Sequence, residues 1–259
     1  MKKSLPLIAM LLLGSHAFAA DLLDTVKQRG TLIIALEGTY PPFNFKDKQQ
    51  QLTGYEVELG NEIAKRLKVK PQFVTGEWSG LLAGLSSGKF DVVMNQVSIT
   101  DARKKVFDFS QPYTVSSAQL IVRKNETRKL ATVDDLKGKK IGVGQGSNYA
   151  DLAKGMAGVE VKTYPGAPEY LQDLVSGRVD AALNDSLLIP FAIKESRLPV
   201  KAGAPVGGLT QMGIPFARNN PQFKAALDKT LSGMQADGTL RKISTKWFGT
   251  DVSKAPQAR

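Results

Sequence analysis

The sequence predicts an α/β protein made of two similar lobes. Segments with helical and strand-like apolar patterns alternate along most of the chain, which is typical of α/β folds. One pattern also occurs twice: residues 88–96 read Gly-Lys-Phe-Asp-Val-Val-Met-Asn-Gln, and residues 177–185 read Gly-Arg-Val-Asp-Ala-Ala-Leu-Asn-Asp. Each copy predicts the end of a helix, a glycine stop and a buried strand, so we expect one copy in each lobe.

The first half of the chain predicts helices and strands in alternation. Gly30 ends an amphipathic helix, and Pro41 and Pro42 exclude regular structure from the loop after the first strand. The expected elements are, in order, a helix at 21–30, a strand at 31–36, a helix at 54–67, a strand at 69–74, a helix from about 78, a strand at 90–94 and a short helix from about 101.

The second half begins with an extended run and then repeats the alternation. Glycine and proline between residues 203 and 208 predict a connector, and the last residues predict a loose tail. The expected elements are an extended run at 113–123, a short helix at 134–136, a strand at 139–143, a helix from about 149, a strand at 159–163, a helix at 167–176, the strand of the second copy, a helix at 186–194, a strand at 211–217, and helices at 219–235 and 239–247.

The first 19 residues have the features of a secretory signal peptide. Lys2 and Lys3 precede an apolar run at 5–14, which is shorter than the roughly 20 residues that a membrane-spanning helix needs. Ala17-Phe-Ala is a small-x-small cleavage site. No cysteine follows it, which excludes a lipoprotein. We expect a soluble periplasmic protein, with an uncleaved N-terminal anchor as the alternative.

The composition excludes several kinds of site. The chain has no cysteine, and its single histidine, His16, lies in the signal segment. The mature chain therefore has no Ser-His-Asp or Cys-His centre, no disulfide and none of the usual structural zinc sites. We expect neither a metal nor a cofactor.

The positive charge of the chain is scattered. The net charge is +11, and about +9 remains without Lys2 and Lys3, since the signal segment has no acidic residue. Basic chains can bind nucleic acid or membrane surfaces. Here no basic block occurs, and export argues against nucleic acid. General solubility explains the charge, and we expect no nucleic-acid partner.

Polar side chains follow the buried strand of the first copy. Asn95 and Gln96 end that strand, Ser98 follows, and Arg103 falls in the first turn of the next helix. Ligands of open α/β sheets bind at the carboxyl ends of strands, and a guanidinium there can hold a carboxylate through two hydrogen bonds. The alternative is a surface arginine in a polar turn.

The second copy ends in an anion. Asn184 and Asp185 could face the amides of the first copy across a cleft between the lobes. A zwitterion with a carboxylate and an ammonium would then fit between Arg103 and Asp185. Tyr40, on the proline loop, either forms an apolar wall of that cleft or packs within the loop. Trp78, near the start of a helix, is either an aromatic wall of the cleft or part of the core.

A glycine-rich loop at residues 142–148 precedes a predicted helix. Gly142 and Gly144 match part of a dinucleotide-binding fingerprint, but Ser147 replaces the third glycine. Ser147 and Asn148 instead lie at a helix N-terminus, whose free N–H groups attract an anion. A carboxylate would serve there as well as a phosphate.

Several motifs extend over nearly the whole mature chain. They are Gly38-Thr-Tyr-Pro-Pro-Phe, Gly54-Tyr-Glu-Val-Glu-Leu, Ser98-Ile-Thr-Asp-x-Arg, Gly144-Gln-Gly-Ser, and Asp237-Gly-Thr-Leu followed by Lys246-Trp-Phe. Together they resemble the extracytoplasmic solute-binding proteins of polar amino-acid ABC transporters. The resemblance implies a two-lobe periplasmic-binding-protein fold (type II), with two αβ lobes joined by two extended hinge segments. The corresponding parts are a first lobe at 20–113 and 213–259, hinges at 114–117 and 206–212, and a second lobe at 118–205.

The resemblance also implies roles for the candidate residues. Arg103 resembles the clamp on the ligand α-carboxylate, and Asp185 resembles the anchor of the α-ammonium. Ser98 and the backbone at Ser147 and Asn148 would assist Arg103, and Tyr40 and Trp78 would form aromatic walls. Glu37 and Gln96 would contact the ligand side chain, and Gly144 would leave space for a long ligand.

Glu37 and the pair Asn95 and Gln96 indicate which branch of the family this chain resembles. Basic-amino-acid binders tend to have Asp where this chain has Glu37, and Ser-Ser where it has Asn95 and Gln96. The combination found here is most similar to the cystine-binding branch. It implies L-cystine as the ligand, with cysteine, glutamine, glutamate or a basic amino acid as alternatives.

The family's mechanism implies hinge closure on the ligand and recognition of the closed form by a membrane ABC permease. We expect a monomer without catalytic residues. Two other classes stay open. One is a cyclohexadienyl-type dehydratase on the same fold, with Glu37 or Glu77 as general acid, and the other is a periplasmic sensor. An ammonium anchor at Asp185 favours an amino acid over a purely carboxylate substrate.

Overall fold

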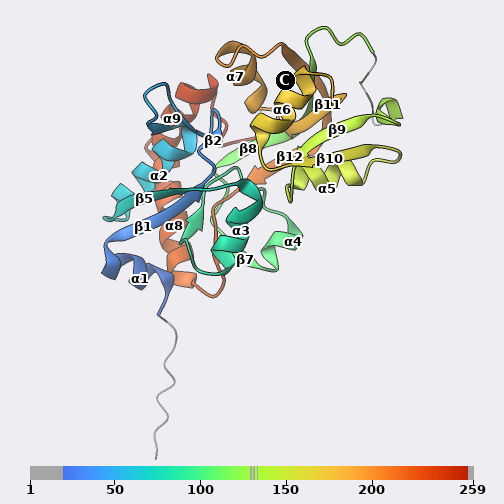
Figure 1. The fold of residues 1–259 in the computed structure, drawn as a ribbon. Helices are drawn as coiled ribbons and strands as arrows, with labels where there is room; N and C mark the ends of the chain where they lie inside the picture. Colours follow the sequence, from blue (N-terminus) through green and yellow to red (C-terminus); the bar gives the residue numbers. More distant parts are fainter. Residues whose placement is uncertain (1–19, 129, 131, 133, 256–259) are drawn as a thin grey trace, which may run out of the picture.

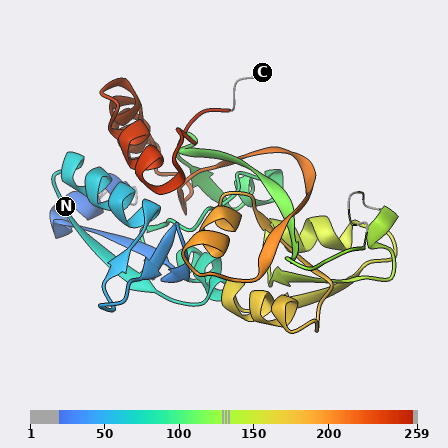
Figure 2. The same cartoon turned by 90° about the horizontal axis from the view of Figure 1, so that it is seen from above.

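The chain forms two lobes that lie side by side (Figures 1 and 2). The computed structural model describes residues 20–128, 130, 132 and 134–255, so the predicted signal segment 1–19 lies outside the described residues. The first lobe contains the beginning and the end of the described chain, in blue and red, and the second contains its middle, from green to orange. In this part of the chain no helix has the length and apolar character needed to span a membrane.

The first lobe is built on a five-stranded sheet with the order β5-β1-β6-β13-β7. Its strands are β1 (Thr31–Leu36), β5 (Lys70–Thr75), β6 (Val92–Val93), β7 (Phe107–Phe109) and β13 (Pro215–Ala217). The first three are parallel, and β13 is antiparallel to β6 and β7. A small sheet joins β2 (Thr39–Tyr40), β3 (Asn44–Lys46) and β4 (Leu52–Thr53). The helices are α1 (Leu22–Arg29), α2 (Tyr55–Arg66), α3 (Trp78–Ser86), α4 (Asp101–Lys104), α8 (Pro221–Ala236) and α9 (Thr239–Phe248).

The second lobe has a sheet of the same design, with the order β10-β9-β11-β8-β12. Its strands are β8 (Thr114–Arg123), β9 (Lys140–Gly144), β10 (Glu160–Tyr164), β11 (Ala181–Asp185) and β12 (Val200–Met212). Again three strands are parallel, and β8 is antiparallel to β11 and β12. The helices are the 3₁₀ turn η1 (Asp134–Leu136), α5 (Asn148–Lys154), α6 (Ala167–Val175) and α7 (Leu188–Lys194).

The internal repeat is confirmed by the structure. α3 and α6 are each 9 residues long, and each is followed by a glycine and a strand at the centre of its sheet. Gly88 and Gly177 have φ of 73° and 81°, a left-handed conformation that glycine adopts without a steric penalty. The repeated glycine therefore ends the helix in both lobes.

β8 and β12 form the passage between the lobes. Thr114 pairs with Met212 at one end of this ribbon, and the register shifts between Val206 and Leu209. The predicted hinges 114–117 and 206–212 thus lie in paired strands. Their role as hinges stays a prediction.

Two expectations from the sequence were wrong. The connector expected at 203–208 is part of β12, where Pro205 pairs with Gln119. β12 is an edge strand, and edge strands tolerate proline and glycine at bulges. The tail is not loose at Val252, which is 4% exposed and whose carbonyl accepts a hydrogen bond from Val115 N at 2.7 Å. The apolar Val252 side chain packs into the core.

Candidate ligand-binding site between the lobes

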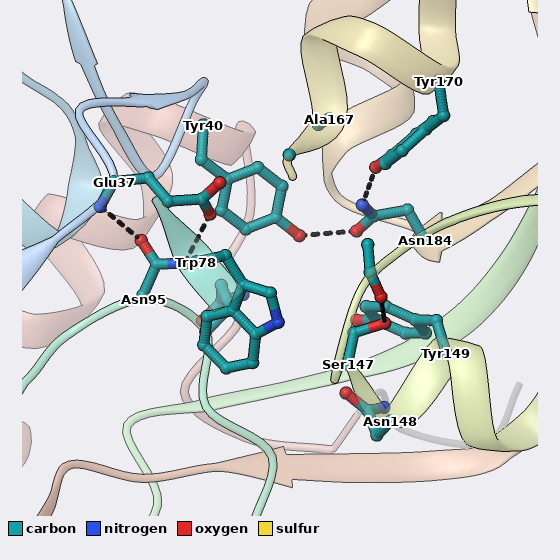
Figure 3. Close-up of a pocket in the computed structure, with 13 residues that line it drawn as sticks. Glu37, Tyr40, Trp78, Asn95, Ser147, Asn148, Tyr149, Ala167, Tyr170 and Asn184 are labelled. Atoms are coloured by element: carbon teal, nitrogen blue, oxygen red, sulfur yellow. Dashed lines mark hydrogen bonds between the residues drawn. The ribbon is translucent and has the colours of Figure 1, made fainter. Parts of the chain in front are cut away.

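A cavity lies between the lobes (Figure 3). Its walls come from the carboxyl ends of the parallel strands and from the starts of α3, α5 and α6. Eight predicted residues line it, namely Glu37, Tyr40, Trp78, Asn95, Gln96, Gly144, Ser147 and Asn148. Asn184, which was expected to face the cleft, also lines it, together with four residues that were not predicted, namely Tyr149, Gly166, Ala167 and Tyr170.

Glu37 and Asn95 bind each other in the first-lobe wall. Glu37 N donates to Asn95 Oδ1 at 2.9 Å, and Asn95 Nδ2 donates to Glu37 Oε2 at 2.6 Å. The two residues follow the neighbouring strands β1 and β6, so the sheet brings them together. Burial raises the pKa of Glu37 to about 7. The carboxyl group can therefore gain or lose a proton near neutral pH.

Gln96 offers an unpaired amide to the cavity. Its side-chain oxygen and nitrogen are both buried, and neither has a hydrogen-bond partner among the described residues. Buried polar groups in proteins are nearly always paired. The backbone of Gln96 is left-handed, with φ of 48°, which is unusual for a residue with a side chain. Both features are typical of a residue that contacts a ligand.

Ser147 confirms the predicted start of a helix at the second-lobe wall. Its Oγ accepts from Ala150 N at 3.1 Å and so caps α5. The same hydroxyl donates to Gly144 O at 2.7 Å. The Ser147 side chain thus holds the glycine-rich loop in place.

Tyr40 connects the two lobes directly. Its hydroxyl donates to Asn184 Oδ1 at 2.5 Å, and Asn184 Nδ2 donates to the Tyr170 hydroxyl (Figure 3). The internal repeat aligns Asn184 with Asn95, and for this reason Asn184 was expected to face the cleft. No comparable pattern in the sequence pointed to Tyr149 and Tyr170.

Arg103 and Ser98 lie next to the cavity rather than in its wall. The guanidinium carbon of Arg103 is 5.4 Å from the centroid of the Trp78 ring, and Nη1 donates to Ser98 O at 3.1 Å. Thr100 caps the short helix α4 by accepting from Arg103 N at 3.2 Å. Burial lowers the pKa of Arg103. Its guanidinium is half-buried and makes no salt bridge within the described chain.

Asp185 is fully buried, one residue away from the cavity wall. Oδ2 accepts from Ser116 Oγ at 2.6 Å and from the Tyr149 hydroxyl at 3.3 Å, and Oδ1 accepts from Leu187 N at 2.9 Å. Burial raises the pKa of Asp185 to about 6. No cation of the described residues pairs with it, and those residues contain no cluster of His, Cys, Asp and Glu that could hold a metal ion.

Residues 32–250 match the family of bacterial extracellular solute-binding proteins, family 3. The chain belongs to this family. Family membership confirms the two-lobe type II fold, and it places the protein among extracytoplasmic binding proteins.

This solute-binding protein is similar to two L-cystine-binding proteins. It is 44% identical to TcyJ of Escherichia coli K12 over 234 residues, which cover 90% of this chain and 88% of the relative. It is 41% identical to TcyA of Bacillus subtilis 168 over 241 residues, covering 92% and 89%. A similar solved structure is that of an ancestral amino acid-binding protein, a precursor of cyclohexadienyl dehydratase, with a TM-score of 0.81, 34% identity, and coverage of 88% of this chain and 100% of that one.

The buried carboxyl groups predict how the stability of the ligand-free protein depends on pH. Burial raises the pKa of Glu37 and Glu56 from 4.5 to about 7, and that of Asp185 from 3.8 to about 6. At pH values between the unshifted and the raised pKa, the folded state binds more protons than the unfolded state. The free energy of unfolding therefore falls as pH rises through this range. We expect the melting temperature to decline from about pH 4.5 to about pH 7.

Thermal unfolding of ligand-free protein at a series of pH values checks this. Glu37→Gln should make the decline shallower, whereas Glu58→Gln, at an exposed salt bridge of α2, should leave its slope unchanged. A melting temperature that rises throughout this pH range would contradict the prediction.

Proposed function

We propose that this solute-binding protein binds L-cystine between its lobes and delivers it to an ABC permease. The observation that carries the proposal is a pair of charges without a salt-bridge partner, one on each lobe beside the cavity. Among the described residues, Arg103 on the first lobe forms no salt bridge, although the Asp151 carboxylate acts on it electrostatically, and Asp185 on the second lobe pairs with no cation. The α-carboxylate and α-ammonium of an amino acid would compensate both.

Tyr149 lies in the cavity wall and is close to both charged side chains. Its hydroxyl donates to Asp185, and it lies close enough to Arg103 for the guanidinium to counteract the rise in its pKa that burial causes. An amino acid next to Tyr149 would therefore have a cation and an anion of the protein within reach. Trp78, against which Arg103 packs, provides the apolar wall.

The second end of cystine would meet Glu37 and Gln96. An ammonium there favours the ionised form of Glu37, which lowers its raised pKa. The unpaired amide of Gln96 can bond to the second carboxylate or ammonium. The similarity to two cystine-binding proteins supports this ligand.

Hinge closure is the proposed mechanism. The lobes would rotate about residues 114–117 and 206–212, and the Tyr40–Asn184 hydrogen bond would join them in the closed form. We propose that the signal peptide is removed and that the protein acts in the periplasm as a monomer, with no lipid anchor. The closed form would then present both lobes to the permease.

A dehydratase is the second candidate function. Glu37, with a pKa near 7, could act as a general acid at neutral pH, and the similar ancestral structure is a precursor of cyclohexadienyl dehydratase. A purely carboxylate substrate would leave the buried Asp185 without a cation. We therefore propose binding without catalysis, and turnover of prephenate by the purified protein would overturn it.

A panel of ligands should single out cystine. Protein freed of bound ligand by unfolding and refolding is heated with cystine, cysteine, Gln, Glu, His, Arg, Lys or prephenate. A ligand at 100 times its dissociation constant adds about 2.7 kcal/mol. For a chain of this size that raises the melting temperature by about 5–11 °C. A shift with another amino acid but not with cystine would contradict the proposed ligand.

Arg103→Ala should abolish cystine binding and leave the fold intact. The change removes the guanidinium that is proposed to hold the α-carboxylate, on a helix of only 4 residues at the surface of the first lobe. Isothermal titration measures the affinity, and circular dichroism measures the fold. Lys104→Ala is the matched control, since its exposed ammonium pairs with Asp101 on the same helix. Near-normal affinity of Arg103→Ala would refute the assigned role.

A further inference from the structure

Glu56 is a buried carboxylate close to the ligand cavity but absent from its wall. It lies in the first turn of α2 and is 0% exposed. Its Oε1 accepts from Gln96 N at 2.7 Å and from the Tyr113 hydroxyl, and its Oε2 accepts from Asn44 Nδ2 at 2.8 Å. It forms no salt bridge with any described residue, so only hydrogen-bond donors stabilise it.

The hydrogen bond from Gln96 N to Glu56 fixes the orientation of Gln96. The left-handed backbone of Gln96 is disfavoured for a residue with a side chain, and it needs support from the surrounding structure. The bond from Gln96 N to the Glu56 carboxylate provides that support. As a result the unpaired amide of Gln96 stays in the cavity wall.

The hydrogen bond from Asn44 to Glu56 is the first of a series that reaches Glu37. Asn44 Nδ2 donates to both Glu56 Oε2 and Asn95 Oδ1, the second at 2.9 Å. Asn95 Nδ2 in turn donates to Glu37 Oε2. The orientation of the Asn44 amide is fixed, because its Oδ1 accepts from Gly38 N at 2.8 Å. The orientations of the Asn44 and Asn95 amides in this series of hydrogen bonds therefore depend on the Glu56 carboxylate at its end.

We propose that Glu56 is a positioning residue of the ligand site. It fixes the orientation of Gln96 through the Gln96 backbone, and that of Glu37 through Asn44 and Asn95. Gln96 and Glu37 are the two side chains assigned to the second end of the ligand. The inference rests on the proposed function of the cavity. It adds a residue that affects affinity without touching the ligand.

A glutamine cannot replace Glu56 in this role. Glutamine has one oxygen and one NH₂ group, whereas Gln96 N and Asn44 Nδ2 each require an acceptor on a different oxygen of Glu56. In either orientation the NH₂ group faces one of these two donors. Turning the Asn44 amide would relieve the conflict only by breaking its bonds to Gly38 and Asn95. The isosteric change therefore disturbs the cavity wall without changing its volume.

Three variants test the proposal. Glu56→Gln removes one acceptor, Tyr113→Phe removes the third donor but keeps both bonds that lead to the cavity, and Glu58→Gln is the control on the same helix. Titration with the amino acid that stabilises the wild type most gives the affinity, and thermal unfolding gives the stability. We expect Glu56→Gln to weaken binding about tenfold or more. The other two should stay within about twofold of the wild type.

The outcomes separate a positioning role from a general loss of stability. Lower melting temperatures for Glu56→Gln and Tyr113→Phe, with lost affinity only in the first, support the proposal. Wild-type affinity in Glu56→Gln, or an equal loss in Tyr113→Phe, overturns it. A wild type that binds another amino acid but not cystine overturns the proposed ligand instead. If Glu56→Gln does not fold, hydrogen exchange of wild-type protein decides, because a fast-exchanging Gln96 amide would contradict its bond to Glu56.

Discussion

The site depends on buried carboxyl groups that are held by amides and hydroxyls instead of cations. Glu37, Glu56 and Asp185 are each at most 9% exposed, and none forms a salt bridge within the described chain. Ionising such groups costs free energy, which is why burial raises their pKa values. In the proposed complex, ligand ammonium groups would supply the missing cations at Asp185 and Glu37. Ligand binding would then offset part of the free-energy cost of burying these two carboxylates.

The repeated architecture explains how these groups come together. Each lobe places three parallel strands beside one another, and their carboxyl ends point to the space between the lobes. Polar residues at strand ends and at the starts of α3, α5 and α6 then form opposite walls of one cavity. Tyr40 and Asn184 bond across it, so its shape depends on the position of one lobe relative to the other. A ligand that contacts both walls would favour this closed arrangement.

Much of the fold and part of the site follow from local sequence. Gly88 and Gly177 mark the repeat because only a residue without a side chain adopts their φ without a penalty. Asn95 was predicted because it follows a strand, and strand ends gather at one edge of a sheet, whereas Glu37 was predicted only through the resemblance to the family. Tyr149 and Tyr170 were missed because their contacts depend on how the lobes and helices pack. Glu56 was missed as a site residue because its position in α2 shows no sign of its bond to Gln96.

A crystal structure with bound L-cystine tests the central claim most directly. The account predicts cystine in the cavity between the lobes. One carboxylate should lie within hydrogen-bond distance of Arg103 and the neighbouring ammonium beside Asp185, with the second end against Glu37 and Gln96. Cystine bound outside this cavity, or with a carboxylate against Glu37 and no contact with Arg103, would contradict it.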